Sequence, residues 1–240
     1  MQAVLSFVRQ FRILRFEICV TLMQLPSKLI ERTLFRRGVR WIAAVDEAGR
    51  GAWAGPVVAA AVLFDAAAFH DAAKRFCGVA DSKLLSPAMR TAAFEVMTTS
   101  RCLRYAVGQS TAATIDRINI RQAAFLAMAR AVGNLPQRPD VILVDGIDPV
   151  RGIEMIQQCF AHGDRRIFSI AAASIIAKVT RDRLMDALAQ DYPRYGFEKH
   201  KGYGTALHQA RLAAFGPSPI HRRSYAPVAG LLYDQLRVKI

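Results

Sequence analysis

The chain has 240 residues, which is enough for one large domain with a hydrophobic core of its own. Its composition, 52% hydrophobic and 22% charged, is ordinary for a globular protein and excludes wholesale disorder. There are 33 Lys and Arg against 19 Asp and Glu, a net charge of +14 that favours a polyanionic partner, nucleic acid before a membrane surface. A basic surface that serves only solubility is the alternative.

The cysteines and the apolar segments limit the cellular setting. None of the four cysteines forms a Cys-x-x-Cys pair, so neither a zinc site nor a disulfide framework is expected, and a reduced, cytoplasmic location fits. The longest uncharged apolar run, Ala52 to Phe64, is shorter than the roughly 18 residues that span a bilayer. It also contains Pro56, which would break a helix. We therefore expect no membrane partner.

The first 40 residues differ in composition from the rest. They hold eight Lys and Arg but two acids, so +6 of the net +14 lies there. Apolar residues such as Phe7, Phe11 and Leu14 recur among the arginines, as in a basic amphipathic helix that targets an organelle, lies on a membrane or binds nucleic acid. The alternative is a dispensable leader. We expect a poorly ordered basic extension over 1–40 and one main domain over 41–240.

From residue 41 onward, short apolar runs alternate with helical patterns, which predicts an α/β domain. The expected strands cover residues 41–46, 56–64, 103–107 and 141–144, the first two forming a hairpin. Three helices are expected. The first begins at an N-cap, Asp116 or Asn119, and ends at about Val132. The second covers about Ile170 to Ala189, and the third runs from a cap at Thr205 to Phe215, before Gly216 and Pro217.

Acidic residues follow two of the expected strands. Asp46 and Glu47 end the first, Asp145 ends the fourth, and Asp164 lies in the loop ahead of the long helix. Sites in α/β proteins assemble at strand ends, where the sheet fixes the side chains. Charges beside a buried strand are costly unless something offsets them, and a bound cation is the usual offset. The four carboxylates therefore predict a cation site.

Carboxylate oxygens select hard cations such as Mg²⁺ or Mn²⁺. Four acids can hold two such ions about 3.5–4 Å apart, a spacing that clamps the attacking and leaving oxygens of a phosphodiester. Because successive strand residues face opposite sides, Asp46 and Glu47 share a site only where the strand ends or twists. Each acid also has a simpler interpretation: a solvated strand end for Asp46 and Glu47, a turn for Asp145, a helix cap for Asp164.

Glycine and basic residues lie near these acids. Gly49 and Gly51 flank Arg50, so no side chain at these two positions keeps a ligand from the backbone. Lys83 and Lys178 are candidate phosphate contacts, and residues 194–223 carry six Lys and Arg against one acid. Phosphate contacts position a duplex and give salt-sensitive affinity. Any single lysine of this kind is otherwise a solvated charge.

Together these stretches resemble the ribonuclease HII family, the type 2 ribonucleases H, over about residues 41 to 228. The stretches that carry the resemblance are Val45-Asp46-Glu47-Ala48-Gly49-Arg50-Gly51, Ala54-Gly55-Pro56-Val57-Val58, Asp81-Ser82-Lys83, Ile115-Asp116-Arg117-Ile118-Asn119-Ile120, Val144-Asp145-Gly146, residues 172–182 (AASIIAKVTRD), His200-Lys201-Gly202-Tyr203-Gly204-Thr205 and His221-Arg222-Arg223-Ser224. Eight blocks in family order make coincidence implausible.

The resemblance implies a ribonuclease H-like α/β fold, with a central mixed sheet flanked by helices and a helical C-terminal part. It also implies a metal-dependent endonuclease, working with Mn²⁺ or Mg²⁺, that acts as a monomer. Its substrates would be RNA–DNA hybrids and duplex DNA with embedded ribonucleotides. Cleavage 5′ of the ribonucleotide would leave a 3′-hydroxyl and a 5′-phosphate.

By the same resemblance, Asp46, Glu47, Asp145 and Asp164 correspond to the metal-site carboxylates of the family. The loop Gly49-Arg50-Gly51 corresponds to the one that reads the ribonucleotide 2′-hydroxyl, largely through backbone groups, and this hydroxyl is what separates RNA from DNA. Tyr203 corresponds to the tyrosine that packs on the sugar at the RNA–DNA junction.

Four positions depart from the family pattern: Leu84, Thr114, Ile147 and His162 stand where lysine, glutamate, asparagine and lysine are usual. None removes a proposed metal ligand, although Asp164 follows the altered position 162 closely. Two other functions stay open: a nuclease on the same scaffold that cuts DNA without ribonucleotides, and a non-catalytic nucleic-acid-binding module.

Overall fold

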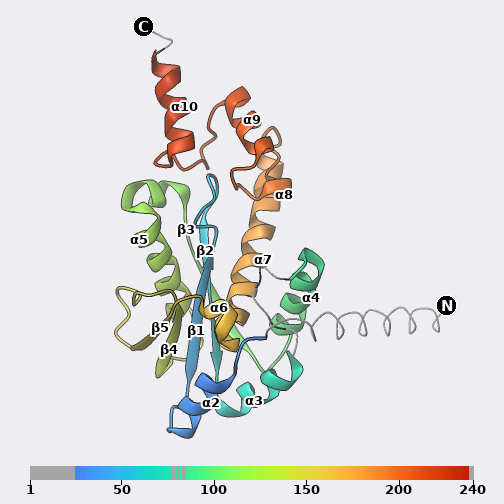
Figure 1. Cartoon of the computed structure of the whole chain (residues 1–240), viewed down its shortest axis with the longest axis vertical. Helices are drawn as coiled ribbons and strands as arrows, with labels where there is room; N and C mark the ends of the chain where they lie inside the picture. Colours follow the sequence, from blue (N-terminus) through green and yellow to red (C-terminus); the bar gives the residue numbers. More distant parts are fainter. Residues whose placement is uncertain (1–24, 77–78, 80–81, 83–84, 238–240) are drawn as a thin grey trace, which may run out of the picture.

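A single five-stranded mixed sheet forms the centre of the computed structural model, which describes residues 25–76, 79, 82 and 85–237 (Figure 1). The strand order is β3-β2-β1-β4-β5. The strands are β1 (Ile42–Ala48), β2 (Val57–Phe64), β3 (Arg104–Ser110), β4 (Val141–Asp145) and β5 (Ile156–Phe160). β2 pairs antiparallel with β1 and β3, whereas β4 runs parallel to β1 and β5. The expected mixed sheet and its initial hairpin are confirmed.

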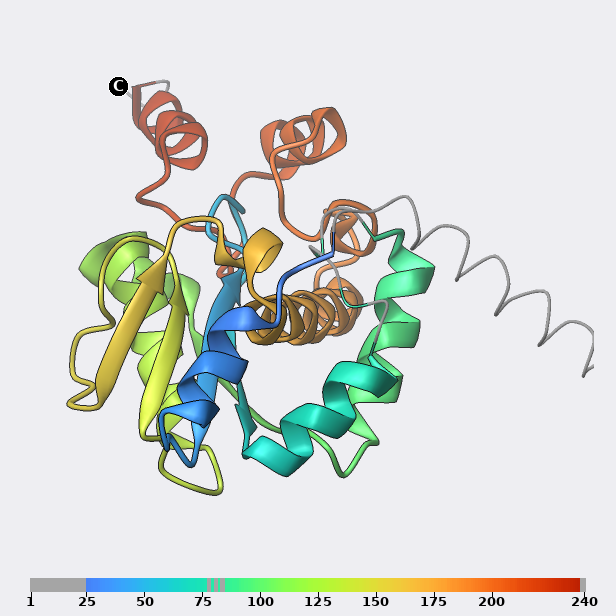
Figure 2. The same cartoon turned by 60° about the horizontal axis from the view of Figure 1, so that its bottom comes forward.

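Helices cover both faces of the sheet (Figure 2). In chain order they are α2 (Leu29–Arg36), α3 (Ala66–Arg75), α4 (Pro87–Thr98), α5 (Ala112–Gly133), α6 (Gly163–Arg166), α7 (Phe168–Asp191), α8 (Phe197–His200), α9 (Ala206–Phe215) and α10 (Ala226–Arg237). α5 packs on one face, and α7 packs on the other. α8, α9 and α10 gather beyond one end of the sheet (Figure 1), which is the expected helical C-terminal part.

The two central strands are buried on both faces, because each face lies under a helix. Alternate residues of β1 belong to separate cores: Ile42 and Ala44 pack with α7, and Ala43 and Val45 pack with α5. Small side chains let these layers approach closely. A Cβ on Gly108 of β3 would lie 2.2 Å from a backbone oxygen of α5, which explains the glycine there.

The helix after β3 starts earlier than the sequence predicts. Thr111 caps α5 by accepting a hydrogen bond from the Thr114 N–H. The helix is then interrupted at Asn119, whose φ of 63° and ψ of 165° are non-helical, and the Asn119 side chain accepts from Gln122 N–H and caps the second half. Of the two predicted caps, Asn119 is confirmed. Asp116 instead accepts hydrogen bonds from the backbone of residues 223 and 224.

The other predicted helices are confirmed, with small extensions. The long helix expected over 170–189 is α7, and Thr205 caps α9 by accepting from the His208 N–H. Gly216 ends α9 with a φ of 70°. The sequence did not predict α2, α3, α4 or β5. No helix in the described part of the chain is both long and apolar enough to cross a membrane.

Part of the expected N-terminal extension is packed against the main domain. Within residues 25–40, α2 places Glu31 in a fully buried position, where its Oε1 accepts hydrogen bonds from Ser169 N–H at 2.9 Å and Ser169 Oγ–H at 2.8 Å. Ser169 lies in the first turn of α7, so the carboxylate satisfies a helix N-terminus from outside the helix. The expected division at residue 40 thus falls inside the packed body, and residues 1–24 lie outside the described residues.

We expect Glu31→Ala to lower the free energy of unfolding by about 1–3 kcal/mol, because the first turn of α7 loses its hydrogen-bond acceptor in a buried place. Burial raises the pKa of this carboxyl above its ordinary value. The neutral variant Glu31→Gln keeps an acceptor oxygen and should retain most of the stability. Urea unfolding compares the two; an alanine variant with the wild-type midpoint would contradict the capping role.

Candidate active site

Two of the predicted acids are neighbours in the sheet. β1 and β4 are parallel and paired with Val45 opposite Val144, so Asp46 and Asp145 take the next positions on adjacent strands. Their side chains lie on the α7 face of the sheet, because both follow the alternation of the residues before them. Asp164, in α6, is 3% exposed, and the neighbouring Gly163 N–H donates to Asp145 Oδ1 at 2.7 Å. The fold therefore brings three segments of the chain to one strand end.

Asp46 is the most enclosed of these acids, with 4% exposure. Its Oδ1 accepts from Glu47 N–H at 2.7 Å, and its carboxylate also bonds to the Ser174 hydroxyl of α7. Ser174 Oγ lies 3.0 Å from Ser82 Oγ, so a chain of hydroxyls supports this side chain. Burial, followed by the charges of Glu47 and Asp145, raises the pKa of Asp46 well above its ordinary value.

Glu47 faces a cation of the following loop. Its Oε1 lies 3.1 Å from Arg50 Nη1. Burial raises the pKa of Glu47, the Arg50 charge opposes this rise, and the Asp145 charge adds to it. The Asp145 charge thus acts in the same direction on the pKa of Asp46 and on that of Glu47. A divalent cation bound among these acids would offset the repulsion between their charges and lower their raised pKa values.

The chemistry of the donor set fits a hard cation, since all four acids offer oxygen. In the described part of the chain, no three His, Cys, Asp or Glu side chains form a ready-made ligand cluster. Asp46 and Asp145 bond to backbone N–H groups and Glu47 bonds to Arg50. These bonds hold the three side chains, and each carboxylate keeps further lone pairs that a cation could take.

The loop after β1 rests on a buried arginine. Arg181 of α7 is fully buried and donates to the backbone carbonyls of Ala54 and Pro56, at 3.1 and 2.9 Å, and of Lys201, at 2.9 Å. Gly49 has a φ of +95°, and a Cβ there would lie 2.0 Å from Arg181 Nε. Glycine is thus required at position 49, because a side chain there would clash with the buried Arg181. At Gly51 a Cβ would meet no atom of the described residues within 4 Å.

Tyr203 lies beside the same arginine. Its ring centroid is 5.2 Å from Arg181 Cζ and 5.3 Å from Lys178 Nζ. Lys178 also pairs with Asp182 at 2.7 Å, so it is a partly buried ion-pair partner as well as a candidate phosphate contact. Lys83, the other candidate phosphate contact, lies outside the described residues.

Three buried histidines fix the segment that carries Tyr203. A ring nitrogen of His208, Nδ1, lies 3.0 Å from the Tyr203 carbonyl oxygen, and its Nε2 lies 3.0 Å from His221 Nε2. His200 stacks on His208 with 4.3 Å between ring centroids. Burial lowers the pKa of His208 and His221 to about 4, and their mutual proximity adds to this for His221. The cluster is therefore neutral at neutral pH.

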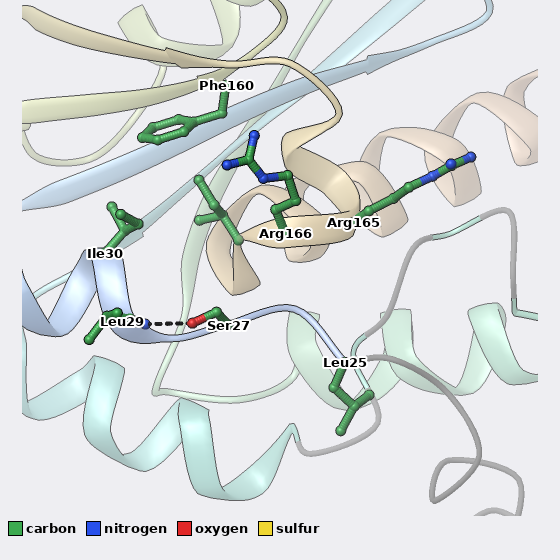
Figure 3. A pocket seen from close by; sticks show the side chains of 8 residues that line it. Leu25, Ser27, Leu29, Ile30, Phe160, Arg165 and Arg166 are labelled. Atoms are coloured by element: carbon green, nitrogen blue, oxygen red, sulfur yellow. Dashed lines mark hydrogen bonds between the residues drawn. The ribbon is translucent and has the colours of Figure 1, made fainter.

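A cavity of about 350 Å³ lies beside α6, between residues 25–30 and the start of α7 (Figure 3). Its lining is mainly apolar, with Leu25, Ile30 and Phe160 among its walls. Arg166 turns toward Phe160, whereas Arg165 extends away from it. None of the four acids lines this cavity, so it is separate from the carboxylate site.

Sequence reasoning missed several side chains that hold the site. Ser174 and Arg181 lie seven residues apart on α7, and both are buried and polar within an alanine-rich helix. Arg222 is also fully buried. All three fall within stretches that carry the family resemblance, which was the signal available. Their partners could not be read from the sequence, because they are backbone groups and a carboxylate on other elements.

Comparisons with known proteins show which family the chain resembles. The family model described as Ribonuclease HII matches residues 43–228. Ribonuclease HII of Geobacter sulfurreducens is 52% identical over 193 residues, which cover 80% of this chain and 85% of that protein. Ribonuclease HII of Paracoccus denitrificans is 45% identical over 88% of this chain and 96% of its own length.

Solved structures show the same fold. The crystal structure of ribonuclease H2 from Pyrococcus horikoshii superposes with a TM-score of 0.67 and 29% identity, over 82% of this chain and 99% of that one. A Bst-RNase HIII structure, in complex with Mn²⁺, has a TM-score of 0.65 at 19% identity, which concerns the fold alone. With the family match over residues 43–228, these findings show that the chain belongs to the ribonuclease HII family and is a ribonuclease H.

Proposed function

We propose that the protein hydrolyses the RNA strand of RNA–DNA hybrids and cuts 5′ of single ribonucleotides in duplex DNA, leaving a 3′-hydroxyl and a 5′-phosphate. The observation that carries the proposal is the placement of Asp46 and Asp145 side by side, directly before the loop 49–51. The carboxylates that would act on the phosphodiester therefore lie next to the loop that would contact the adjacent sugar.

Asp46, Glu47, Asp145 and Asp164 would hold divalent ions, Mn²⁺ or Mg²⁺. The chemistry supplied by such ions would be a lower pKa for an attacking water and charge stabilisation for the leaving 3′ oxygen. The protein itself orients the ligands: the Ser174 hydroxyl and the Glu47 N–H both bond to the Asp46 carboxylate. A carboxylate whose rotamer is fixed by hydrogen bonds loses less entropy when it binds an ion.

Substrate selection is assigned to Gly51, Arg50 and Tyr203. The exposed loop offers backbone groups that could hydrogen-bond to a 2′-hydroxyl. Deoxyribose has only a hydrogen at this position, so a close main chain can distinguish the two sugars. Tyr203 offers an aromatic ring next to Lys178 and Arg181, which suits a sugar with an adjoining phosphate. The net charge of +14 supports binding of a duplex through its phosphates. We further propose that the protein works as a monomer in the cytoplasm and removes ribonucleotides from DNA.

The test is a substrate panel in Mg²⁺, in Mn²⁺ and in EDTA. An RNA–DNA hybrid should be cut in either metal and left intact in EDTA, while the same duplex made entirely of DNA should stay intact throughout. Cutting of the all-DNA duplex would favour a nuclease of another specificity on this scaffold. Salt-dependent binding of the hybrid with no cutting in either metal would favour a binding module.

The glycines on either side of Arg50 should respond differently to alanine. Gly49→Ala forces a positive φ on a residue with a Cβ and drives that Cβ into Arg181, so we expect stability to fall by about 2 kcal/mol or more. Gly51→Ala places a methyl in open space outside the loop, so the melting temperature should stay within about 2 °C of wild type while cleavage falls about tenfold or more.

Thermal melting and single-turnover cleavage of the hybrid separate the two effects, and each variant serves as the control for the other. A Gly51→Ala protein that cuts at the wild-type rate would show that the sugar is read elsewhere. A Gly49→Ala protein as stable as wild type would show that the loop does not rest on Arg181 as described.

A further inference from the structure

Two side chains of the C-terminal part donate hydrogen bonds to the carbonyl oxygen of Arg50. Arg222 Nη1 donates to this oxygen at 2.9 Å, and the Tyr225 hydroxyl donates to it as well. Arg222 also donates from Nε to the Gly55 carbonyl at 3.0 Å. The Arg222 guanidinium lies over the Tyr225 ring, with its Cζ 5.2 Å from the ring centroid. The buried guanidinium of Arg222 therefore donates hydrogen bonds to two carbonyl oxygens of the loop.

The rest of the loop is anchored through its carbonyls too. Those of Ala54 and Pro56 accept from Arg181, and that of Trp53 accepts from the backbone N–H of Arg222. The N–H groups of Trp53, Ala54 and Gly55 are bonded as well, to the carbonyls of Gly202 and Ile220. At the Arg50–Gly51 peptide, by contrast, the described residues bond to the carbonyl and not to the N–H.

Peptide planarity gives this anchoring a consequence for the outer surface. In a trans peptide the C=O of one residue and the N–H of the next point in opposite directions. Because Arg222 and Tyr225 hold the Arg50 C=O inward, the Gly51 N–H points outward. No atom of the described residues accepts a hydrogen bond from this N–H, and Gly51 is exposed. A cation on the carbonyl side also polarises the peptide and makes its N–H a stronger donor.

The burial of Arg222 is weak evidence for a purely stabilising role. It is fully buried, and its Nη2 has no hydrogen-bond partner in the described part of the chain. Replacing a buried charged side chain by an apolar one of similar volume is often neutral or stabilising. A role in positioning the loop accounts for a cation at this place.

We propose that Arg222, assisted by Tyr225, is a specificity-determining positioning residue that fixes the Arg50–Gly51 peptide so that the Gly51 N–H donates to the 2′ oxygen of a ribonucleotide. This inference rests on the proposed function and deepens it, since it names the side chains that orient the sugar-reading backbone. Neither side chain touches the reacting atoms, and both act through the Arg50 carbonyl.

Tyr225→Phe is the sharpest variant, because it keeps the ring under Arg222 and removes only the hydroxyl, which donates to the Arg50 carbonyl and accepts from Arg222 Nη1 at 3.0 Å. Arg222→Lys keeps a cation but cannot donate to residues 50 and 55 in the same geometry. Tyr105→Phe, on the partly exposed face of β3, removes a hydroxyl far from the loop and is the matched control.

Three quantities are measured for each protein: the melting temperature, the affinity for an all-DNA duplex in EDTA, and the single-turnover rate on the same duplex with one ribonucleotide. For Tyr225→Phe we expect about a tenfold loss of rate. The melting temperature should stay within a few degrees of wild type, and the affinity for the all-DNA duplex should stay within about twofold. Arg222→Lys should lose more rate, and Tyr105→Phe none.

An unchanged rate for Tyr225→Phe, with wild type active, overturns this inference and leaves the proposed function intact. A loss of rate matched by an equal loss of all-DNA affinity also overturns it, because the side chain would then serve duplex binding and not sugar reading. If wild type cuts no ribonucleotide-containing duplex, the proposed function itself fails.

Discussion

Replacing Asp46 by Asn is expected to lower the single-turnover rate of hybrid cleavage at least about 10³-fold. The amide keeps the size and one oxygen of the carboxylate but removes the charge that would hold a divalent ion beside Asp145. The measurement is product formation from a labelled RNA–DNA hybrid in excess enzyme. Because Asp46 contributes no cation to duplex binding, affinity for the hybrid should change little.

The same substitution should not destabilise the protein. Burial and two neighbouring carboxylates raise the pKa of Asp46, which means that its charge is unfavourable in the folded state. The melting temperature of Asp46→Asn is therefore expected to equal or exceed that of wild type. Asp71→Asn, at an exposed position of α3, is the control and should keep full activity. A fully active Asp46→Asn protein would remove this acid from the site.

Acidification should destabilise the protein through the histidine cluster. His208 and His221 have a pKa of about 4 in the folded state, below the 6.5 of an unperturbed imidazole. Between these values the unfolded chain binds protons that the folded chain does not, so the free energy of unfolding falls as pH falls from about 6.5 toward 4. From pH 7.5 to pH 5 the loss is about 2 kcal/mol for each histidine.

Urea unfolding at the two pH values measures this loss, and NMR titration of the imidazoles checks its origin. Carboxyls with raised pKa values, including Asp46 and Glu47, act in the opposite direction, so the informative quantity is the difference between wild type and a His208→Gln/His221→Gln variant. The exposed His70→Gln is the control. Two cluster imidazoles that titrate near pH 6.5 would contradict the buried, neutral arrangement.

Apolar strands and regular helices were predictable, because their patterns are local. Uninterrupted runs of buried residues identify β1, β2 and β4, and cap residues identify the ends of α9. β5 was missed because Gln157 and Gln158 interrupt its apolar pattern at the sheet edge. Gln157 bonds to the backbone of residues 150 and 153, a loop contact that no periodicity reveals.

The acids in the last paired positions of β1 and at the end of β4 were predictable from their positions after apolar runs, although β1 extends past Asp46 and Glu47 to Ala48. The structure places Asp46 and Asp145 on adjacent strands. Their supporting side chains were not. Ser174 and Arg222 act on groups more than 100 residues away in the chain, and such partners follow only from tertiary packing. The sequence also suggested that Gly49 leaves room for a ligand, whereas its Cβ position is filled by Arg181.

The acids and the loop 49–51 are expected to act together at one nucleotide. The most direct measurement is the mapping of cuts in a DNA duplex with one ribonucleotide, in Mg²⁺ and in Mn²⁺, beside the same duplex with deoxyribose at that position. We expect a single cut on the 5′ side of the ribonucleotide, with a 3′-hydroxyl and a 5′-phosphate, and none in the deoxyribose duplex. Cuts at other positions, or equal cutting of both duplexes, would contradict it.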